Sequence, residues 1–582
     1  MAVGDGGEDD NSSFSGMSSA TQKPAKRSSA ITRSTSPKHS ISLGLDFGTE
    51  SVRALLVDLK GIERASAVVA FPHGQITRKL PGTGEDLPHN FALQHPLDWI
   101  DSAARAVRRA LKSAKCAPES VIGIGVDFTS CTMLPALADG TPLCCTEKFA
   151  GEKFAWPKLW KHHGAKTQTD RINEVARLRK EPWLARYGGI IGLEWFFPKV
   201  LETLENSPRV YAATEVWLEA GDWFVWQLVG GPASQLPRST CQAGYKGMWS
   251  RKDGFPSPAF FKALHPLLEN VVGEKMPGHF LAPGEPAGGL RLAMAKRLGL
   301  QAGTPVSAAI IDAHAGVPGA GASEPGTLVM VMGTSSCHML NSAANQRVPG
   351  VAGLVEDGIL PGLFGYETGQ AAVGDAFDWC RRTLGQRDFA ALTAKASALP
   401  AGAQGVRCID WMNGCRTPLM DGSLSGAFCG LTLNHGPEHL FRALLEGSAC
   451  GLRWIVDQLQ EHGVEVKRYV ATGGLPHHNP LFLQICADML GKPITIHPCK
   501  HGPALGAAIL GALAAGSSVT GFKSVGAAIR SMAQPKSLKP QVVIPRRVET
   551  TNYDSVYADY RQLADALVAL KSSSNSPRRK TK

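Results

Sequence analysis

The chain has 582 residues, of which 43% are hydrophobic, and it carries a formal net charge of +11 at pH 7. Its longest run of small apolar residues, 504–516, is too short and too rich in alanine to cross a bilayer, and no apolar segment of a secretory signal opens the sequence. These properties exclude a membrane protein and predict a globular chain with room for two domains, each with its own core.

The positive charge is concentrated near the C-terminus. Residues 571–582 contain basic side chains and no acidic one, which is typical of a solvated chain end, so we expect no nucleic-acid partner. The 13 cysteines include no Cys-x-x-Cys pair, which argues against a cysteine-bound zinc ion and against a disulfide framework. A reducing compartment, the cytoplasm, fits this cysteine usage.

The domain organisation follows from the composition along the chain. Residues 1–40 are rich in serine and threonine and poor in large apolar residues, so we expect a disordered leader there. Residues 571–582 form a basic disordered tail by the same argument. Between the two ends we expect two domains, residues 41–303 and residues 304–570.

The folded part begins with a predicted strand, a tight turn and a second strand. Leu43, Leu45 and Phe47 alternate with small residues, and an apolar run follows at residues 52–57. In the turn, Gly48 lets the backbone approach a phosphate closely, and the turn amides can point at its oxygens. Asp46 can hold Mg²⁺ directly or through water. The alternative is an ordinary hairpin with a surface aspartate.

The rest of the first half alternates helices and strands. A helical periodicity covers residues 98–114, and a continuous apolar run at 120–127 predicts a buried strand that brings a polar cluster, residues 127–132, to the edge of a sheet. Further helices are expected at residues 158–163, 171–180, 198–205 and 217–228. Seven tryptophans are expected mostly in the core, with one or two lining a pocket: Trp156, Trp160, Trp183, Trp195, Trp217, Trp223 and Trp226.

The second half shows the same alternation, which indicates an α/β architecture. A predicted strand at 304–311 ends in Asp312, a second at 326–332 leads into the turn 333–336, and a third at 466–471 leads into the turn 472–475. Helices are expected at residues 374–384, 439–460 and 480–490.

Three turns, at residues 46–49, 333–336 and 472–475, follow predicted strands and offer glycine and backbone amides. Two phosphate-holding hairpins and a Gly-Gly turn that lies flat against a nucleoside would form an ATP cleft between two domains. Neither a P-loop nor a dinucleotide-binding Gly-x-Gly-x-x-Gly is present. The expected fold class is therefore α/β, a two-domain actin-like ATPase (ribonuclease H-like) fold with an interdomain cleft.

Longer motifs extend this interpretation. The chain resembles the FGGY family of carbohydrate kinases, and within it the ribulokinases, over residues 41–565. The motifs that carry the resemblance are residues 125–135 with 139–144, 158–163, 310–315, 332–339, 361–367, 426–431 and 439–446.

The resemblance implies a role for each matching position. Asp312 would be the catalytic base, and Asp46 would hold or orient Mg²⁺. The ketopentose would contact Lys246, Glu367, Ser130 and Asp312. ATP would contact Asp46, Gly48, Thr49, Gly333, Thr334, Ser335, Gly473 and Gly474.

The implied reaction is ATP-dependent phosphorylation of L-ribulose to L-ribulose 5-phosphate in L-arabinose catabolism, with other 2-ketopentoses as further substrates. Two alternatives stay open, a kinase of the same family that acts on D-ribulose or xylulose, and a non-catalytic sugar and nucleotide sensor on the same fold. A homodimer is a further open alternative. The neighbouring histidines His435 and His439 lack a metal-binding pattern and are expected at the surface.

Overall fold

The computed structural model describes residues 40–535 and 539–574. Its first large sheet has the strand order β3-β2-β1-β4-β10-β9, with β11 also paired to β4. Strands β1, β2 and β3 are antiparallel neighbours, and β4 runs parallel to β1. The strands are β1 (Ile41–Phe47), β2 (Ser51–Asp58), β3 (Glu63–Ala70), β4 (Val121–Phe128), β9 (Pro286–Gly289), β10 (Pro305–Ser307) and β11 (Ile310–Ile311).

The second large sheet repeats this plan in the order β14-β15-β13-β12-β18-β19-β20. Strands β12, β13, β15 and β14 are antiparallel neighbours, and β18 runs parallel to β12. The strands are β12 (Thr327–Met332), β13 (Ser336–Ser342), β14 (Gly353–Glu356), β15 (Phe364–Gln370), β18 (Arg468–Thr472), β19 (Ile494–Ile496) and β20 (Gln541–Val543).

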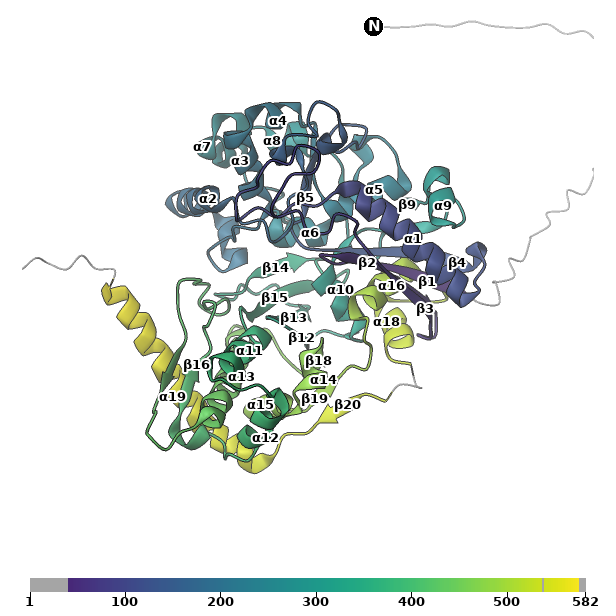
Figure 1. Cartoon of the computed structure of the whole chain (residues 1–582). Helices are drawn as coiled ribbons and strands as arrows, with labels where there is room; N and C mark the ends of the chain where they lie inside the picture. The colour runs from purple at the N-terminus through teal and green to yellow at the C-terminus, as the bar shows by residue number, and fades with distance from the viewer. Residues whose placement is uncertain (1–39, 536–538, 575–582) are drawn as a thin grey trace, which may run out of the picture. The chain divides into compact units, whose positions relative to one another are not determined.

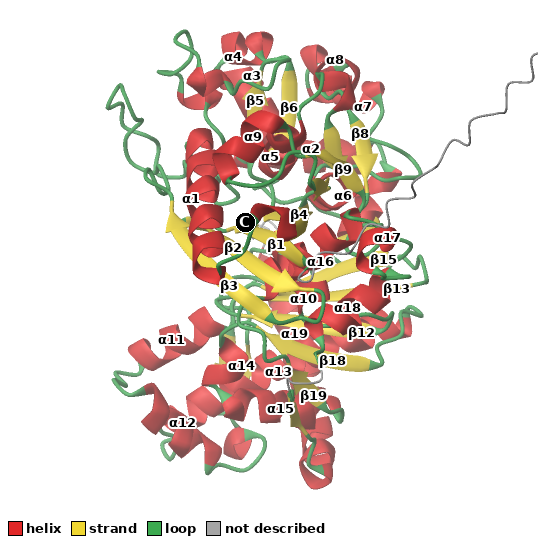
Figure 2. Ribbon diagram, turned by 90° about the vertical axis from the view of Figure 1, so that its right-hand side faces the viewer, coloured by secondary structure: helices red, strands yellow, loops and turns green. Residues whose placement is uncertain are grey.

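Helices cover both faces of each sheet, and α10 and α16 lie between the two sheets (Figure 1). The outer face of the first sheet packs on α1, which runs along β2 and β3 (Figure 2), and on α5 and α9. The outer face of the second sheet shares a core with α13 and α15, and α11 and α19 pack against these helices. These helices are α1 (Pro96–Ala114), α5 (Ala220–Val229), α9 (Leu292–Leu298), α10 (Asp312–Gly319), α11 (Gly374–Thr383), α13 (Pro437–Glu461), α15 (Pro480–Leu490), α16 (Gly502–Ala514) and α19 (Arg547–Ser574).

The contact between α16 and the first sheet explains the glycines of β4. A Cβ atom added to Gly125 would lie 1.7 Å from the carbonyl oxygen of Ala507, so only glycine allows the helix to lie this close. The hydroxyl of Ser42 on β1 donates a hydrogen bond to the carbonyl of Ala508 at 2.6 Å. A helix from the second half of the chain is therefore part of the support of β1 and β4.

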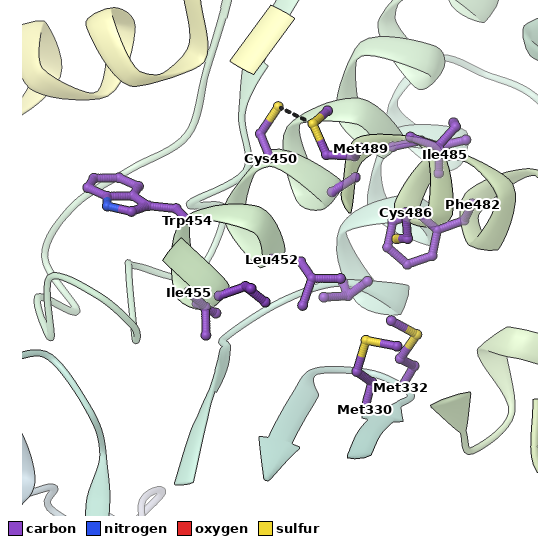
Figure 3. Close-up of a cluster of buried hydrophobic side chains, with 14 of the residues drawn as sticks. Met330, Met332, Cys450, Leu452, Trp454, Ile455, Phe482, Ile485, Cys486 and Met489 are labelled. Carbon is purple, nitrogen blue, oxygen red and sulfur yellow. Dashed lines mark hydrogen bonds between the residues drawn. The ribbon is translucent and has the colours of Figure 1, made fainter. Parts of the chain in front are cut away.

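The core behind the second sheet is a layer of large apolar and sulfur-containing side chains (Figure 3). Met330 and Met332 of β12 face side chains of α13 and α15, and the Cys450 and Met489 sulfurs are 4.0 Å apart. Burial of this layer fixes the direction of β12 and with it the position of the turn that follows the strand.

The remaining elements belong to two insertions and short connections. They are β5 (Met133–Ala136), α2 (Lys166–Leu178), α3 (Phe196–Asn206), α4 (Pro208–Ala213), β6 (Val216–Glu219), β7 (Pro237–Ser239), α6 (Thr240–Lys246), α7 (Pro258–Leu264), α8 (Val271–Lys275), β8 (His279–Leu281), α12 (Phe389–Ser397), β16 (Arg407–Ile409), β17 (Ala427–Cys429), α14 (Leu475–His478), α17 (Ser517–Thr520) and α18 (Val525–Ala533). Among the described residues, no helix is long and apolar enough to cross a membrane.

Most predicted elements are confirmed, and three predictions are wrong. Residues 158–163 form no helix, because Lys158 joins backbone bridges to Leu93 and Met133. The helix expected at 217–228 begins only at Ala220, after strand β6. Helix α19 continues to Ser574, into the tail that we expected to be disordered from 571. Residues 1–39 and 575–582, most of the two expected disordered ends, lie outside the described residues.

Candidate active site

Three carboxyl groups meet where strands of the first sheet end. Asp46 of β1 pairs in register with Asp127 of β4, and Ile310 of β11 pairs with Asp127 from the other side. Asp312 follows β11 directly and is the first residue of α10. The parallel pairing of β1, β4 and β11 therefore brings the predicted metal-binding and catalytic aspartates to one edge.

The surroundings of these groups shift their protonation. Burial raises the pKa of Asp312 to about 7, and the charge of Asp46 adds to this effect. The main-chain N–H of Ala313 donates to the Asp312 carboxylate at 2.7 Å. Burial and the charges of Asp46 and Asp312 also raise the pKa of Asp127 well above its usual range, and its carboxyl hydrogen-bonds to Asp46.

The surroundings of Asp127 indicate which kind of ligand this edge of the sheet can bind. Asp127 is fully buried, and no cationic side chain among the described residues forms an ion pair with it. The cation nearest to the cluster is the side chain of Arg53, 3.8 Å from Asp46. Carboxyl oxygens of this kind, with only one distant cation of the described chain beside Asp46, suit Mg²⁺, which prefers carboxylates and retains several waters. The residues present therefore fit the metal ion that the resemblance implies.

The turn between β1 and β2 places Gly48 and Thr49 beside this edge. The N–H of Gly48 donates to the carbonyl of Ser51 at 3.0 Å and closes the turn. Gln94 donates to the main-chain carbonyl of Thr49 at 2.7 Å, and the indole N–H of Trp160 donates to its hydroxyl at 3.1 Å. Trp160 is thus the one of the seven tryptophans that meets a predicted site residue at the surface, since the other six are buried.

The two turns of the second sheet lie next to each other. Val331 of β12 pairs with Thr472 of β18, so the turn at Gly333 adjoins the turn at Gly473. The N–H of Gly333 donates to the carbonyl of Ser335 at 3.0 Å. The remaining predicted residues of these turns, Thr334 and Gly474, are exposed, and so is Gly473. Exposed turns at adjacent strand ends present backbone N–H groups to a ligand.

Lys246 and Glu367 form a buried ion pair instead of two solvated surface charges. The Lys246 Nζ lies 3.0 Å from Glu367 Oε1, and Glu367 Oε2 lies 3.3 Å from the ring of His314. Arg416 makes a second, shorter contact with Glu367. Burial alone would raise the pKa of Glu367, but Lys246 and Arg416 hold it well below its usual range. Glu367 is therefore a fixed anion with several donors around it.

Ser130 lies on the loop after β4, and its hydroxyl is 3.2 Å from the sulfur of Cys131. Cys131 has a φ of 56°, which is uncommon for a residue other than glycine. The carbonyl of Cys131 accepts a hydrogen bond at 2.7 Å from Lys199, a fully buried lysine. This contact holds the loop in a strained conformation, with Ser130 half-buried.

Sequence reasoning placed Asp127 in the polar cluster at this edge and His314 in a family motif but gave neither a role, and it missed Arg416. Asp127 had a signal, because it ends a buried strand in register with Asp46. His314, two residues after Asp312, had a weaker one. No signal in the sequence pointed to Arg416, because a long connection brings it to Glu367. One surface expectation is wrong, since His439 is buried and accepts the N–H of Gly436 at 3.0 Å.

Comparisons with known proteins agree with this geometry. Residues 328–515 match the model of the FGGY family of carbohydrate kinases, C-terminal domain. The chain is 44% identical to a ribulokinase of Halalkalibacterium halodurans over 539 residues, covering 90% of the chain and 94% of the relative. It is 43% identical to a ribulokinase of Bacillus licheniformis over 528 residues, covering 88% and 94%.

A solved structure shares the fold. The xylulose kinase of Rhodospirillum rubrum superposes with a TM-score of 0.73 at 24% identity, covering 91% of this chain and 99% of that one. The expected actin-like α/β fold is confirmed by this likeness. The chain belongs to the FGGY family of carbohydrate kinases.

Proposed function

We propose that this protein is an ATP-dependent kinase of L-ribulose that forms L-ribulose 5-phosphate. The observation that carries the proposal is the identity of 43–44% to ribulokinases over 94% of their length. The buried carboxyl of Asp312 at the edge of the first sheet supports it independently of the comparisons. L-arabinose catabolism is the pathway in which this reaction would serve.

Proton removal is the step for which Asp312 is suited. A sugar hydroxyl is a weak nucleophile, and a carboxylate within hydrogen-bond reach accelerates its attack by about 10²–10⁴-fold. A pKa of about 7 leaves a good part of Asp312 ionised near neutral pH and makes it a better base than an exposed aspartate. In this proposal Asp312 accepts the proton of the attacking hydroxyl.

The ketose hydroxyls would meet Lys246, Glu367 and Ser130. A pocket built from fixed polar groups discriminates strongly against a sugar that lacks the matching hydroxyl, because the buried groups would be left unpaired. The ion pair at 3.0 Å supplies a donor and an acceptor whose positions are already set before the sugar arrives.

Phosphate and nucleoside would lie against the glycine turns. Backbone N–H groups of Thr49, Thr334 and Ser335 would neutralise the phosphate oxygens, and the turns that Gly48 and Gly333 close would position these groups. Gly473 and Gly474 would face the adenosine. Asp46, with Asp127 behind it, would hold Mg²⁺ directly or through water. When bound, Mg²⁺ supplies the positive charge that phosphoryl transfer needs on the phosphate oxygens.

Domain limits, location and assembly complete the proposal. We place an N-terminal domain at residues 41–303 and a C-terminal one at 304–570, although β10 and β11, residues 305–311, pair with β4 of the first sheet. We propose the cytoplasm as location and a homodimer as assembly. Size-exclusion chromatography with light scattering tests the homodimer.

The proposal is tested by a coupled ADP-release assay over a panel of pentuloses and related polyols. L-ribulose should give the highest kcat/KM, and D-ribulose and xylulose should follow. The Asp312→Asn variant controls for ADP released without sugar phosphorylation. A preference for xylulose or D-ribulose would indicate a kinase of the same family with that substrate. Binding of sugar and ATP without any phosphorylated product would indicate a non-catalytic sensor.

A further inference from the structure

Two histidines and an aspartate form a cluster away from the proposed catalytic groups. Each of His73, His95 and Asp98 offers one ligand atom, and these three atoms lie within 4.8 Å of one another. Among residues 40–535 and 539–574 this is the one group of three or more histidine, cysteine, aspartate or glutamate side chains with that spacing. The group comes from two segments, the loop after β3 and the start of α1.

The cluster is ordered by its own contacts. Asp98 is buried and accepts from the main-chain N–H of His73 at 2.9 Å with Oδ2, which leaves Oδ1 facing the two rings. The Nδ1 atoms of His73 and His95 lie 2.9 Å and 4.0 Å from that oxygen. The two rings are stacked, with centroids 4.6 Å apart and planes 13° from parallel.

The geometry of the cluster suits a ligand role. The side chain of His73 is 43% exposed, so it can shift toward the other two ligands. Tetrahedral zinc places its ligands about 3.3 Å apart, which small movements of the exposed ring achieve.

We propose that His73, His95 and Asp98 form a binding site for a divalent transition-metal ion, of which Zn²⁺ is the representative. Two imidazoles and one carboxylate leave a fourth position for water, a donor set common for Zn²⁺ and poor for Mg²⁺. The site is distinct from the oxygen-lined edge at Asp46 and does not depend on the proposed kinase activity.

The site would brace the first turn. His95 follows Gln94, whose side chain donates to the carbonyl of Thr49 at 2.7 Å. On the other side, the N–H of Phe71 donates to the carbonyl of Glu50 at 2.9 Å, and Gln75 contacts the Glu50 carboxylate. A metal ion that joins His73 to His95 would cross-link the two segments that hold the turn.

Isothermal titration of the metal-free full chain with ZnCl₂ tests the proposal. The wild-type protein should bind one Zn²⁺ that the variant His73→Ala binds at least about tenfold more weakly, since even outer partners of metal ligands contribute about 10–100-fold. His89→Ala is the matched control, because His89 is an exposed histidine of the same region outside the cluster. MgCl₂ at the same concentrations should not displace the zinc.

Asp98→Asn provides a second variant, because the amide oxygen can still accept the N–H of His73 while the charge is lost. Each variant's melting temperature is compared with and without Zn²⁺, so a change in intrinsic stability cancels. The expected result is a zinc-dependent rise in wild type and His89→Ala that is smaller in the other two variants. Equal zinc affinity and equal thermal shifts in all four proteins would overturn the proposal.

Discussion

The two large sheets repeat one arrangement, an antiparallel hairpin beside a parallel strand, and so their strand ends can be matched position by position. In the first sheet the cross-strand pair one residue before the end of β1 is Asp46 with Asp127. In the second sheet the corresponding pair, one residue before the end of β12, is Val331 with Thr472 of β18. The same backbone geometry therefore carries two acids in one half and none in the other.

We infer that this difference divides the proposed chemistry between the sheets. Carboxylates hold a metal ion and accept protons but repel phosphate, whereas an uncharged edge leaves its N–H groups available to anions. Asp312, which follows β11, is also attached to the first sheet. We infer that the first sheet handles the cation and the proton and that the second sheet handles the phosphates and the nucleoside.

The largest effect is expected from removing the proton acceptor of the acidic edge. Asp312→Asn keeps the shape and the hydrogen bond from Ala313 but cannot take a proton, so kcat should fall by at least about 10²–10⁴-fold. Binding of L-ribulose without ATP, measured by calorimetry, should change little. Turnover close to wild type would remove the catalytic role from the first sheet.

The pH dependence of the wild-type enzyme tests the same residue without a mutation. Because the pKa of Asp312 is about 7, the carboxyl is increasingly protonated below this pH and can no longer accept a proton. The value of kcat/KM should therefore fall by about tenfold per pH unit well below pH 7. Ketose binding, measured over the same range, is the control. A value of kcat/KM that stays constant down to pH 5 would mean that a group other than Asp312 accepts the proton.

The ion pair of Lys246 and Glu367 connects α6 with β15 of the second sheet, and the next prediction concerns it. Lys246→Met removes a charged hydrogen bond that is worth about 1.5–3 kcal/mol, so KM for the ketose should rise about 10–100-fold while KM for ATP changes little. Lys252→Met, on an exposed lysine of the following loop, is the control. An equal rise of both KM values would indicate general disruption instead of a sugar contact.

The second sheet is tested by two neighbouring glycines. A Cβ atom on Gly473 would lie 2.4 Å from the carbonyl oxygen of Met332, at a φ of 94°, whereas one on Gly474 would meet only a His478 carbon at 3.9 Å. Gly473→Ala should therefore lower the free energy of unfolding by about 1–2 kcal/mol or more and raise KM for ATP. Gly474→Ala should do neither to the same extent. Equal kinetic effects of both variants would argue against a specific role of the Gly473 conformation.

The sequence predicts the strand ends well and the ion pair poorly, for a physical reason. The hairpin at residues 41–58 is specified by neighbouring residues through alternation and a glycine turn, so periodicity identifies it. Lys246 and Glu367 are charged residues for which exposure is the usual outcome, and their burial depends on each other and on Arg416. Only the resemblance to a family could point to them.

The wrong helix at residues 158–163 has a similar cause. Lys158 is buried with its Nζ 2.7 Å from Glu202 and 2.6 Å from Thr203, both on α3. These tertiary contacts, together with backbone bridges to two other segments, hold the chain extended against its local preference. A distant acid that stabilises a buried lysine leaves no trace in local periodicity.

The smallest expected effect is on protein stability, and it concerns Asp127, whose position in the second sheet is taken by Thr472. Burial and the charges of Asp46 and Asp312 raise the pKa of Asp127 in the folded protein. The wild type therefore loses stability as pH rises above the pKa of an aspartate in the unfolded chain, about 3.9. Asn does not titrate and can donate to Asp46 as the protonated acid does. Asp127→Asn should therefore match the wild type near pH 4 and be more stable by about 1 kcal/mol or more at pH 8.

Urea denaturation at pH 4 and pH 8 measures the difference in stability between wild type and Asp127→Asn. Repeating the measurement with Mg²⁺ tests whether Asp127 helps to hold the cation. If Asp127 helps to hold the cation, added Mg²⁺ stabilises the wild type more than Asp127→Asn and narrows the gap at pH 8. Asp46→Asn, at a carboxyl with 20% exposure, should gain less stability in the metal-free protein because its charge is better solvated. A variant Asp127→Asn that is less stable than the wild type at pH 8 would mean that the carboxylate is ionised and satisfied in the folded state. In that case Asp127 would stabilise the folded protein at pH 8, and the acidic edge would not lower stability for the sake of function.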